Sequence, residues 1–186
     1  MKFMEDLSLH ILDIVENSIR AEANRITIEI SEDTRKNIFM IKITDNGNGM
    51  DEEMLNRIND PFFTTKSCRT VGLGIPFLAQ AAKECNGDLQ IRTREGEGSS
   101  ITAVFQHDHI DRKPLGSIEK TMTVLIAANP EIDFILIHKK NDDSYTLDTA
   151  DIKKNLDGIP INNPQVIKII KNDISAWLHQ VNNVIQ

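Results

Sequence analysis

Several features that assign small proteins to special classes are scarce in this sequence of 186 residues. Its two cysteines, Cys68 and Cys85, match no metal-binding spacing, so neither a disulfide framework nor a structural zinc site is expected. No apolar run approaches the roughly 18 residues of a membrane-spanning helix. The opening residues MKFMEDLSLH also carry acidic side chains where a signal peptide is apolar. The chain is therefore predicted to be cytoplasmic.

Basic residues are outnumbered as well. The 21 Lys and Arg residues face 28 Asp and Glu residues, which gives a formal net charge of −7. General attachment to a nucleic-acid backbone or an anionic membrane depends on clustered Lys and Arg, and the sequence has no such cluster. Neither partner is expected. With 40% apolar and 26% charged residues, the composition is that of an ordinary globular protein with a core.

The first hundred residues show the periodicities of helices and strands. From Leu7 to Arg20, apolar residues recur on one side at helical spacing, while His10, Asp13 and Asn17 share the other side. Further strands and a second helix are predicted over 26–30, 39–43, 75–85, 88–93 and 100–105. The stretch 45–74 is rich in Gly, Asn and Thr, so it is predicted to be mostly loop, with one short helix at about 51–58.

A polar stretch over 107–114, which ends in a proline, is the predicted boundary between two parts of the chain. Beyond it, the pattern predicts a helix over 117–128, a hairpin of 132–138 with 145–147, a short helix after Asp148 and a final helix from Pro164. The apolar stripe of the final helix consists of Val166, Ile170, Ile174, Trp177, Val181 and Ile185. An exposed Trp177 would indicate a docking helix, whereas burial against residues 117–147 would indicate a small α+β subdomain.

Three short motifs have residue types suited to binding a nucleotide. Asp13 and Asn17 lie four residues apart on one helix face, where an amide oxygen suits Mg²⁺ and a carboxylate can take a proton from water. The run Asp45-Asn46-Gly47-Asn48-Gly49 combines glycines that permit positive φ with a carboxylate that can accept hydrogen bonds from an exocyclic amine. Gly72-Leu73-Gly74 opens a predicted helix, where free N–H groups attract phosphate. Taken singly, the Asp45 run is more often only a turn, the Asp13 and Asn17 pair is more often a solvated helix face, and the Gly72 to Gly74 motif is weak because a glycine pair before a helix is often only a turn.

The order of the motifs resembles a known family. The segments Glu16-Asn17-Ser18, Asp45-x-Gly47-x-Gly49, DPFFTTK (60–66), Gly72-Leu73-Gly74 and GEGS (96–99) resemble, in order, the N, G1, F and G2 boxes and the closing Gly-x-Gly-Thr element of the histidine-kinase ATP-binding domain. That domain belongs to the GHKL superfamily, of Bergerat fold, with the gyrase, heat-shock chaperone and mismatch-repair ATPases. The PFFTTK string is typical of the kinase branch, whereas ENSIRAEANRITI is similar to the mismatch-repair branch. The resemblance covers about residues 7–106.

The resemblance implies a role for each matching residue. Asn17 would hold Mg²⁺, Asp45 would bond the adenine amino group, and Ser99 would lie near adenine through a water molecule. Gly47, Gly49 and Met50 would shape the base pocket. The other nucleotide contacts would come from Phe62, Thr65, Lys66, Gly72, Leu73 and Gly74, of which the last four would meet the phosphates. ATP and Mg²⁺ are therefore the implied cofactors.

The sequence departs from the family pattern at two of these positions. Asp13, the candidate catalytic residue, stands where hydrolysing relatives usually have Glu, and its shorter side chain puts turnover in doubt. Ser99 replaces the usual Thr and keeps the hydroxyl. Moreover, the sequence begins almost at the N-box-like segment, which leaves no room for the helical hairpin that carries the phosphoacceptor histidine. Self-phosphorylation in the usual arrangement is not expected.

Three functions stay open on this basis. The preferred prediction is an ATP-dependent protein kinase that acts in trans on a partner, because phosphoryl transfer needs mainly positioning and charge neutralisation. The second is a nucleotide-gated interaction switch with slow or absent hydrolysis, in which the segment 51–71 closes on ATP. The third is a component of a larger ATPase whose C-terminal region docks or dimerises. A protein partner is expected, and a homodimer is left open.

The predicted fold class is α+β. Helices over 7–20 and 75–85 should cover one face of a mixed, largely antiparallel sheet of Bergerat type, which makes a two-layer α/β sandwich. Residues 1–106 are predicted to form the ATP-binding domain, and residues 107–186 a small C-terminal α+β extension of unrecognised family. ATP is expected between the two helices and the segment 51–71.

Overall fold

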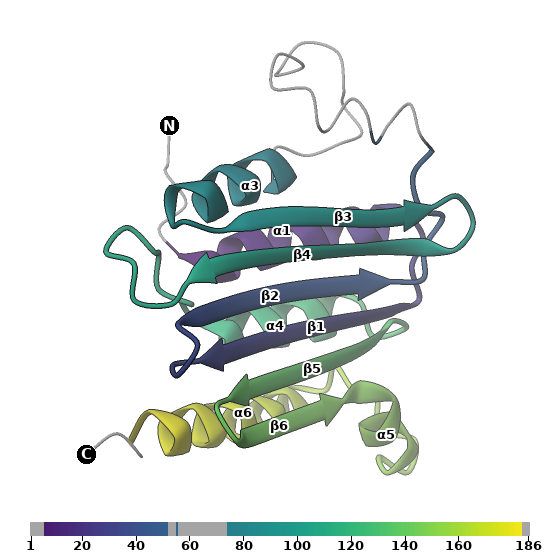
Figure 1. Cartoon of the computed structure of the whole chain (residues 1–186). Coiled ribbons are helices and arrows are strands. Elements are labelled where there is room, and N and C mark those ends of the chain that lie inside the picture. The colour runs from purple at the N-terminus through teal and green to yellow at the C-terminus, as the bar shows by residue number, and fades with distance from the viewer. Residues whose placement is uncertain (1–5, 52–54, 56–73, 184–186) are drawn as a thin grey trace.

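The computed structural model describes residues 6–51, 55 and 74–183, and these residues form one six-stranded sheet with helices packed against it (Figure 1). The strand order is β3-β4-β2-β1-β5-β6. The elements are α1 (Leu7–Arg20), β1 (Arg25–Asp33), β2 (Ile38–Asp45), α3 (Gly74–Glu84), β3 (Asp88–Arg94), β4 (Gly98–Gln106), α4 (Ile118–Ala128), β5 (Asp133–Lys140), β6 (Asp143–Asp148), α5 (Thr149–Lys154) and α6 (Pro164–Asn183). The predicted α+β class is confirmed. The short helix predicted at 51–58 lies largely outside the described residues.

Helix α1 has the bounds that its periodicity predicted. Asp6 caps its first turn, since the Asp6 carboxylate accepts a hydrogen bond from the Leu9 N–H at 3.2 Å. The apolar side, which includes Ile11, Ile14 and Val15, is fully buried under the sheet. The opposite side carries the polar residues, so burial fixes which side chains α1 presents to α3 and to the turn after β2.

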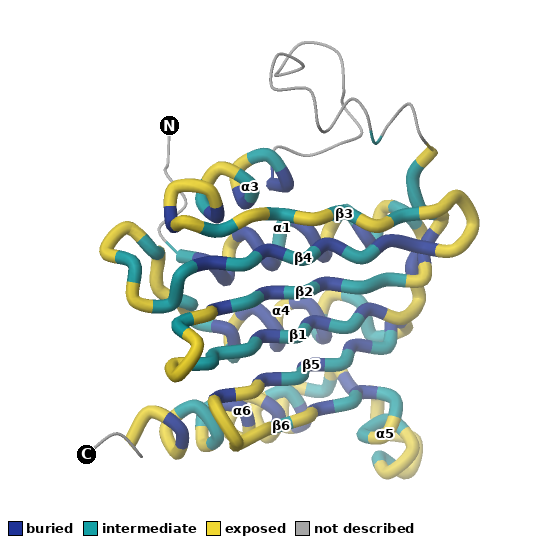
Figure 2. The backbone as a smooth tube through the Cα atoms, viewed as in Figure 1, coloured by how far each residue is buried: buried dark blue, intermediate teal, exposed yellow. Residues whose placement is uncertain are grey.

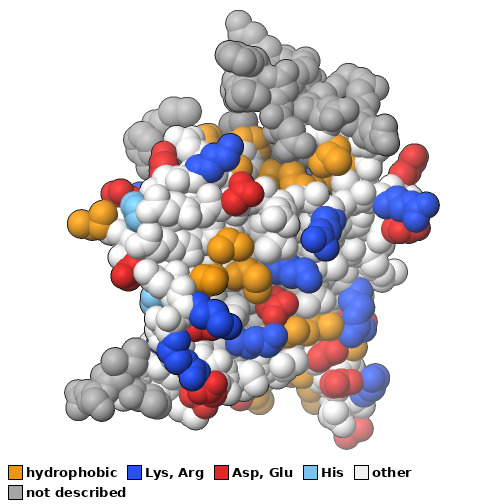
Figure 3. Space-filling model, in the orientation of Figure 1, with side chains coloured by type: hydrophobic (Ala, Val, Ile, Leu, Met, Phe, Trp, Pro, Cys, Tyr) orange, Lys and Arg blue, Asp and Glu red, His pale blue; other side chains and the backbone are white. Residues whose placement is uncertain are grey.

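The sheet is antiparallel from β3 to β1, and alternate residues enter the core. Ile28 pairs with Ile43, and Ile41 pairs with Ala103, all on the covered face. Figure 2 shows the resulting alternation of buried and partly exposed positions along the strands. Each isoleucine buried in this way contributes roughly 1.5–3 kcal/mol. On the face toward the viewer, basic and acidic side chains lie interspersed around a small apolar group (Figure 3).

The C-terminal part of the chain extends the same sheet. Strand β5 lies parallel to β1, with Leu136 opposite Ile28, and β6 returns antiparallel to β5. Helix α6 lies behind β5 and β6, helix α4 lies behind β2 and β1, and their apolar residues join one continuous core with α1 (Figure 1). The division predicted at residue 106 stays a prediction, although the two parts share one sheet.

The apolar stripe of helix α6 is largely buried. Val166, Ile170, Ile174 and Val181 are buried, whereas Ile185 lies outside the described residues. Trp177 is partly buried and stacks on Tyr145 of β6, with ring centroids 5.6 Å apart. The stripe therefore packs against residues 117–147, as expected for a subdomain.

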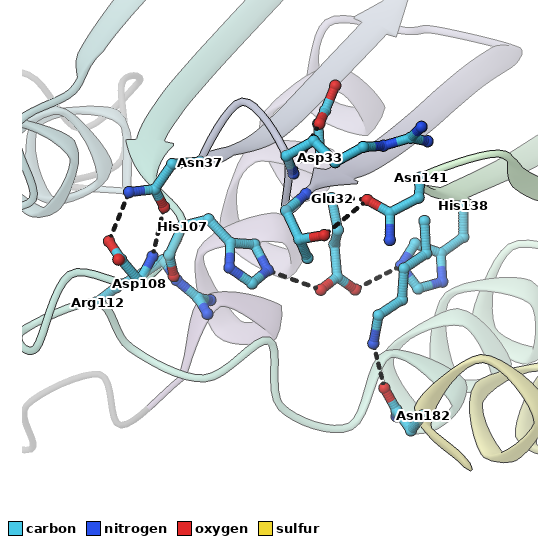
Figure 4. Close-up of polar contacts among 12 residues, drawn as sticks. Glu32, Asp33, Asn37, His107, Asp108, Arg112, His138, Asn141 and Asn182 are labelled. Atoms are coloured by element: carbon cyan, nitrogen blue, oxygen red, sulfur yellow. Dashed lines mark hydrogen bonds and ion pairs between the residues drawn. The ribbon is translucent and has the colours of Figure 1, made fainter. Parts of the chain in front are cut away.

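At the far end of β1, a carboxylate joins three other segments, and Figure 4 shows its two histidine contacts. Glu32 is 3.0 Å from His138 Nε2 in β5 and 3.3 Å from His107 Nε2 after β4. The Trp177 indole N–H of α6 donates to His138 Nδ1 at 2.8 Å. Because an indole nitrogen only donates, His138 Nδ1 must accept, so His138 Nε2 carries the proton that it donates to Glu32. We call these four residues the Glu32 cluster.

The Glu32 cluster keeps its carboxylate ionised. Burial would raise the pKa of Glu32, but the hydrogen bond from His138, the charge of Lys140 and the hydrogen bond from His107 together lower it to about 2. Lys140 is itself buried and donates to Asn182 of α6 at 2.7 Å. Polar contacts thus fasten α6 to the end of the sheet.

Across the described ranges, no helix is both long enough and apolar enough to cross a membrane.

Candidate nucleotide-binding site

Asp45, the last residue of β2, lies at the opposite end of the sheet from the Glu32 cluster. Its Oδ2 accepts a hydrogen bond from Ser18 Oγ of α1 at 2.7 Å. Its Oδ1 accepts from the backbone N–H groups of Gly47, at 3.0 Å, and of Ser99, at 3.2 Å. A carboxylate offers about four acceptor positions. These three neutral donors therefore fix the carboxylate and leave about one position, on Oδ2, for a ligand.

The turn that follows Asp45 is pinned to the start of β1. Asn46 Oδ1 accepts from the N–H groups of Asn24 and Arg25, at 3.1 and 2.9 Å, and Asn46 Nδ2 donates to Asn24 Oδ1 at 2.8 Å. Gly47 packs so closely on the end of α1 that a Cβ there would lie 2.5 Å from the Ala21 carbonyl oxygen. Only glycine fits at that position, which explains the first glycine of the motif.

Behind the turn, the hairpin of β3 and β4 supplies two hydroxyl groups. Ser99 is buried, and its Oγ lies 2.9 Å from Thr93 Oγ1. Thr93 Oγ1 also accepts from the Met50 N–H at 2.8 Å, while Gly49 packs against the Arg94 backbone. The predicted base-pocket residues therefore lie together, and Thr93 connects them.

Helix α1 presents Asp13 and Asn17 beside this turn. Burial, followed by the charge of Glu16, raises the pKa of Asp13, and Arg20 opposes them. Gly74, at the start of α3, lies directly against Asp13, because a Cβ at Gly74 would be 2.7 Å from the Asp13 Cβ. The first turn of α3, whose N–H groups have no partner within the helix itself, therefore lies against the side of α1 that carries Asp13.

Two buried side-chain atoms of α1 have no hydrogen-bond partner among the described residues. One is Asn17 Nδ2, whose amide oxygen accepts from Arg20 Nη1 at 2.9 Å. The other is His10 Nδ1, one turn before Asp13, where burial lowers the pKa of the imidazole. Leaving a buried polar atom unpaired costs roughly 1–3 kcal/mol. Only the Asn17 atom lies beside the turn after β2, whereas His10 lies near the start of α1, close to the charges of Asp6 and Lys113.

A hollow of about 380 Å³ lies alongside the turn, lined by Asn48, Gly49, Met50, Asp51, Glu95 and Gly96. Neither Asp45 nor Asn17 lines it. The hollow is therefore a depression beside the turn and does not contain the two main candidate residues. The candidate site is defined by the hydrogen-bonding groups around Asp45 and Asn17, and not by this hollow.

The structure brings together eight of the predicted site residues around one end of the sheet: Asp13, Asn17, Asp45, Gly47, Gly49, Met50, Gly74 and Ser99. The other five lie outside the described residues: Phe62, Thr65, Lys66, Gly72 and Leu73. Sequence reasoning missed Ser18, Asn46 and Thr93. Ser18 follows Asn17 and Asn46 follows Asp45, so their positions in the motifs were a usable signal, whereas a threonine in a strand gives none.

Comparison with known proteins identifies the family. Residues 5–109 match the family described as "Histidine kinase-, DNA gyrase B-, and HSP90-like ATPase". The chain belongs to this ATPase family. The resemblance inferred from the five boxes is thereby confirmed, and the chain contains an ATP-binding domain of GHKL type.

Two curated relatives of this chain are kinases. Sporulation kinase C of Bacillus subtilis is 36% identical over 94 residues, which cover 50% of this chain and 22% of the kinase. Sensor protein kinase FleS of Pseudomonas aeruginosa is 34% identical over 110 residues, which cover 59% of this chain and 27% of FleS. The chain therefore spans about a quarter of the length of these relatives.

A solved structure, the N-terminal domain of a DNA repair protein, shares the fold. The TM-score is 0.54 at 17% sequence identity, over 78% of this chain and 53% of that one. At this identity the likeness concerns the arrangement of the elements alone.

The residues of this site have the chemistry that an adenine nucleotide requires. The remaining acceptor position on Asp45 suits an exocyclic amine, and the amide of Asn17 offers an oxygen of the kind that Mg²⁺ prefers. In the described part of the chain, no group of three or more His, Cys, Asp or Glu residues could hold a metal ion.

Proposed function

We propose that this protein binds ATP with Mg²⁺ between α1, the turn after β2 and the start of β4, and transfers the γ-phosphoryl group to a protein partner. The observation that carries the proposal is the pairing of a fixed Asp45 carboxylate, which keeps an acceptor position open among the described residues, with the buried, unpartnered amide nitrogen of Asn17 on the adjoining end of α1. The kinase relatives support the choice of reaction.

Asp45 would recognise the base. Its Oδ2 has room for one more donor, and the amino group on C6 of adenine is such a donor. A carbonyl at the same position, as in guanine, would place two acceptors against each other. Ser18, Gly47 and Ser99 keep the carboxylate in place, so little order would be lost when the base binds.

Asn17 would hold the metal ion. Its amide oxygen bonds to Arg20, so binding requires the amide to turn or Arg20 to move away. Once bound, Mg²⁺ would neutralise part of the triphosphate charge. The first turn of α3 can lie close to Asp13 because Gly74 has no side chain. The N–H groups of this turn would donate hydrogen bonds to the phosphates.

Asp13 would accept the proton of the attacking group. The raised pKa of Asp13 makes its carboxylate a stronger base than an exposed aspartate. Its side chain is one methylene shorter than the Glu of hydrolysing relatives, so a small water molecule would be poorly placed. A longer acceptor side chain from a partner could reach in, bond to the γ-phosphorus and release ADP.

Calorimetry with ATP and Mg²⁺ tests the nucleotide site. We expect binding by the unaltered protein and a loss of about a hundredfold or more in Asp45→Asn, because the new amide nitrogen would face the adenine amine donor to donor. Asp88→Asn is the matched control, since Asp88 is an exposed carboxylate on β3. Equal affinity in the two variants would exclude Asp45 as the base-recognising group.

Incubation with γ-labelled ATP and cell extract tests the reaction. Label transferred to another protein supports the kinase. Release of free phosphate alone would indicate an ATPase, and tight binding with neither outcome would indicate a nucleotide-gated switch, which the short side chain of Asp13 favours as the second candidate. Either of these outcomes would overturn phosphoryl transfer to a partner.

A further inference from the structure

The hydroxyl of Thr93 makes three hydrogen bonds at the edge of the candidate site. Its Oγ1 accepts from the Met50 N–H at 2.8 Å, lies 3.1 Å from the Gly98 carbonyl oxygen, and lies 2.9 Å from Ser99 Oγ. All three partners belong to segments that surround Asp45: the turn after β2 and the start of β4.

The single hydrogen of Thr93 decides the direction of these bonds. A hydroxyl has one hydrogen and two lone pairs. The Gly98 carbonyl can only accept, so Thr93 donates its hydrogen there. The Met50 N–H takes one lone pair of Thr93, which leaves the other lone pair to accept the hydrogen of Ser99.

Ser99 is therefore left with lone pairs only. Its hydroxyl hydrogen is held by Thr93, and its backbone N–H is bonded to Asp45 Oδ1 at 3.2 Å. Beside Asp45, which also only accepts when ionised, Ser99 adds a second acceptor. A ligand group that binds both residues has to be a donor.

We infer that Thr93 is a positioning residue that sets the base selectivity of this site: by holding the hydrogen of Ser99, it makes the pocket accept an amine and reject a carbonyl. The inference rests on the proposed function and extends it to the choice of base. Adenine presents an amino group at C6, whereas hypoxanthine and guanine present a carbonyl there. A water molecule between Ser99 and the base would also favour an amine over a carbonyl. This water donates one hydrogen to Ser99 Oγ and accepts a hydrogen bond from the amine of the base.

The affinities of ATP and inosine triphosphate in Thr93→Val test the inference. Valine has the shape of threonine without the hydroxyl, so the Ser99 hydrogen is free to turn into the pocket and donate to the hypoxanthine carbonyl. The unaltered protein should prefer ATP, and Thr93→Val should reduce the ratio of the two affinities roughly tenfold, as expected for one hydrogen bond. Thr93→Ser, which restores the hydroxyl, should keep the ratio within about twofold of the original.

A purely structural role for Thr93 would give a different result. Thr93→Val would then weaken ATP and inosine triphosphate equally, and an unchanged ratio overturns the inference. If Thr93→Val does not fold, Thr93→Ser and Ser99→Ala decide: loss of selectivity in the first, or full selectivity in the second, refutes it. An unaltered protein that binds neither nucleotide instead refutes the proposed function.

Discussion

The two ends of β1 lie beside partly buried carboxylates that are held in different ways. At one end, Glu32 receives hydrogen bonds from two histidines, and the second nitrogen of His138 is itself bonded by Trp177. At the other end, three neutral donors hold Asp45, and Asn17 of the adjoining helix has a buried amide nitrogen with no partner among the described residues. Since an unmade hydrogen bond costs roughly 1–3 kcal/mol, the polar groups are better satisfied at the Glu32 end, and the Asp45 end is where we propose that a ligand binds.

Among the changes that test the difference between the two ends, Glu32→Gln is expected to cause the largest loss of unfolding free energy. The gap between the ordinary pKa of 4.5 and the value of about 2 in the folded protein corresponds to roughly 3 kcal/mol of stability at neutral pH. Urea denaturation, followed by the fluorescence of the single tryptophan, should show this loss. The affinity for ATP should stay within about twofold, and a large fall in affinity would mean that the two ends are coupled.

The difference in unfolding free energy between the unaltered protein and Glu32→Gln should depend on pH. Because the folded state lowers the pKa of Glu32, the carboxylate stabilises the fold above the ordinary value of 4.5, and this contribution disappears as the pH falls toward 2. The difference in unfolding free energy between the unaltered protein and Glu32→Gln should therefore be constant near neutrality and vanish in acid. A difference that persists unchanged at pH 2 would assign the effect to packing.

A smaller loss is expected from Trp177→Phe. Phenylalanine retains an aromatic ring against Tyr145 but cannot donate to His138 Nδ1, which is then left unpaired in a buried place. The expected cost is roughly 1–2 kcal/mol by urea denaturation followed by circular dichroism. In the background of His138→Leu the same change should cost much less, and equal costs in the two backgrounds would show that the hydrogen bond contributes nothing.

The smallest effect, and one of opposite sign, is expected near the start of α1. His10→Leu removes a buried nitrogen without a partner, so the fold should become more stable by about 1 kcal/mol. Since burial lowers the pKa of His10, the unfolded chain binds its proton more readily, and the gain should grow as the pH falls below 6.5. His179→Leu, on the exposed side of α6, is the control that should give no such gain. Destabilisation by His10→Leu would show that His10 has a structural partner.

Local patterns predicted much of the first half of the molecule. The bounds of α1 followed from residues that repeat every three or four positions, and β1 and β2 followed from alternating isoleucines. Five ordered boxes predicted the family, because glycines such as Gly47 stand where the backbone approaches too closely for any side chain. These features could be predicted because the residues that form the sequence pattern are the same residues that determine the local structure.

Contacts between distant segments could not be predicted in this way. The hairpin of β5 and β6 was expected, but its parallel pairing with β1 joins residues about a hundred positions apart and leaves no periodic trace. The Glu32 cluster draws on four separate segments, and Trp177 had appeared only as one member of an apolar stripe. Thr93 was missed for the same reason, since its role depends on which partners the fold brings to its hydroxyl.

The parallel pairing of β1 with β5 has a practical consequence for anyone who shortens the protein. In a fragment that ends at residue 106, strand β1 would lack its neighbour β5. The N–H and C=O groups of β1 that pair with β5 at eight positions would then be exposed, next to Ile26, Ile28 and Ile30. Such an edge invites strands from other molecules, so the fragment should aggregate unless another chain covers it.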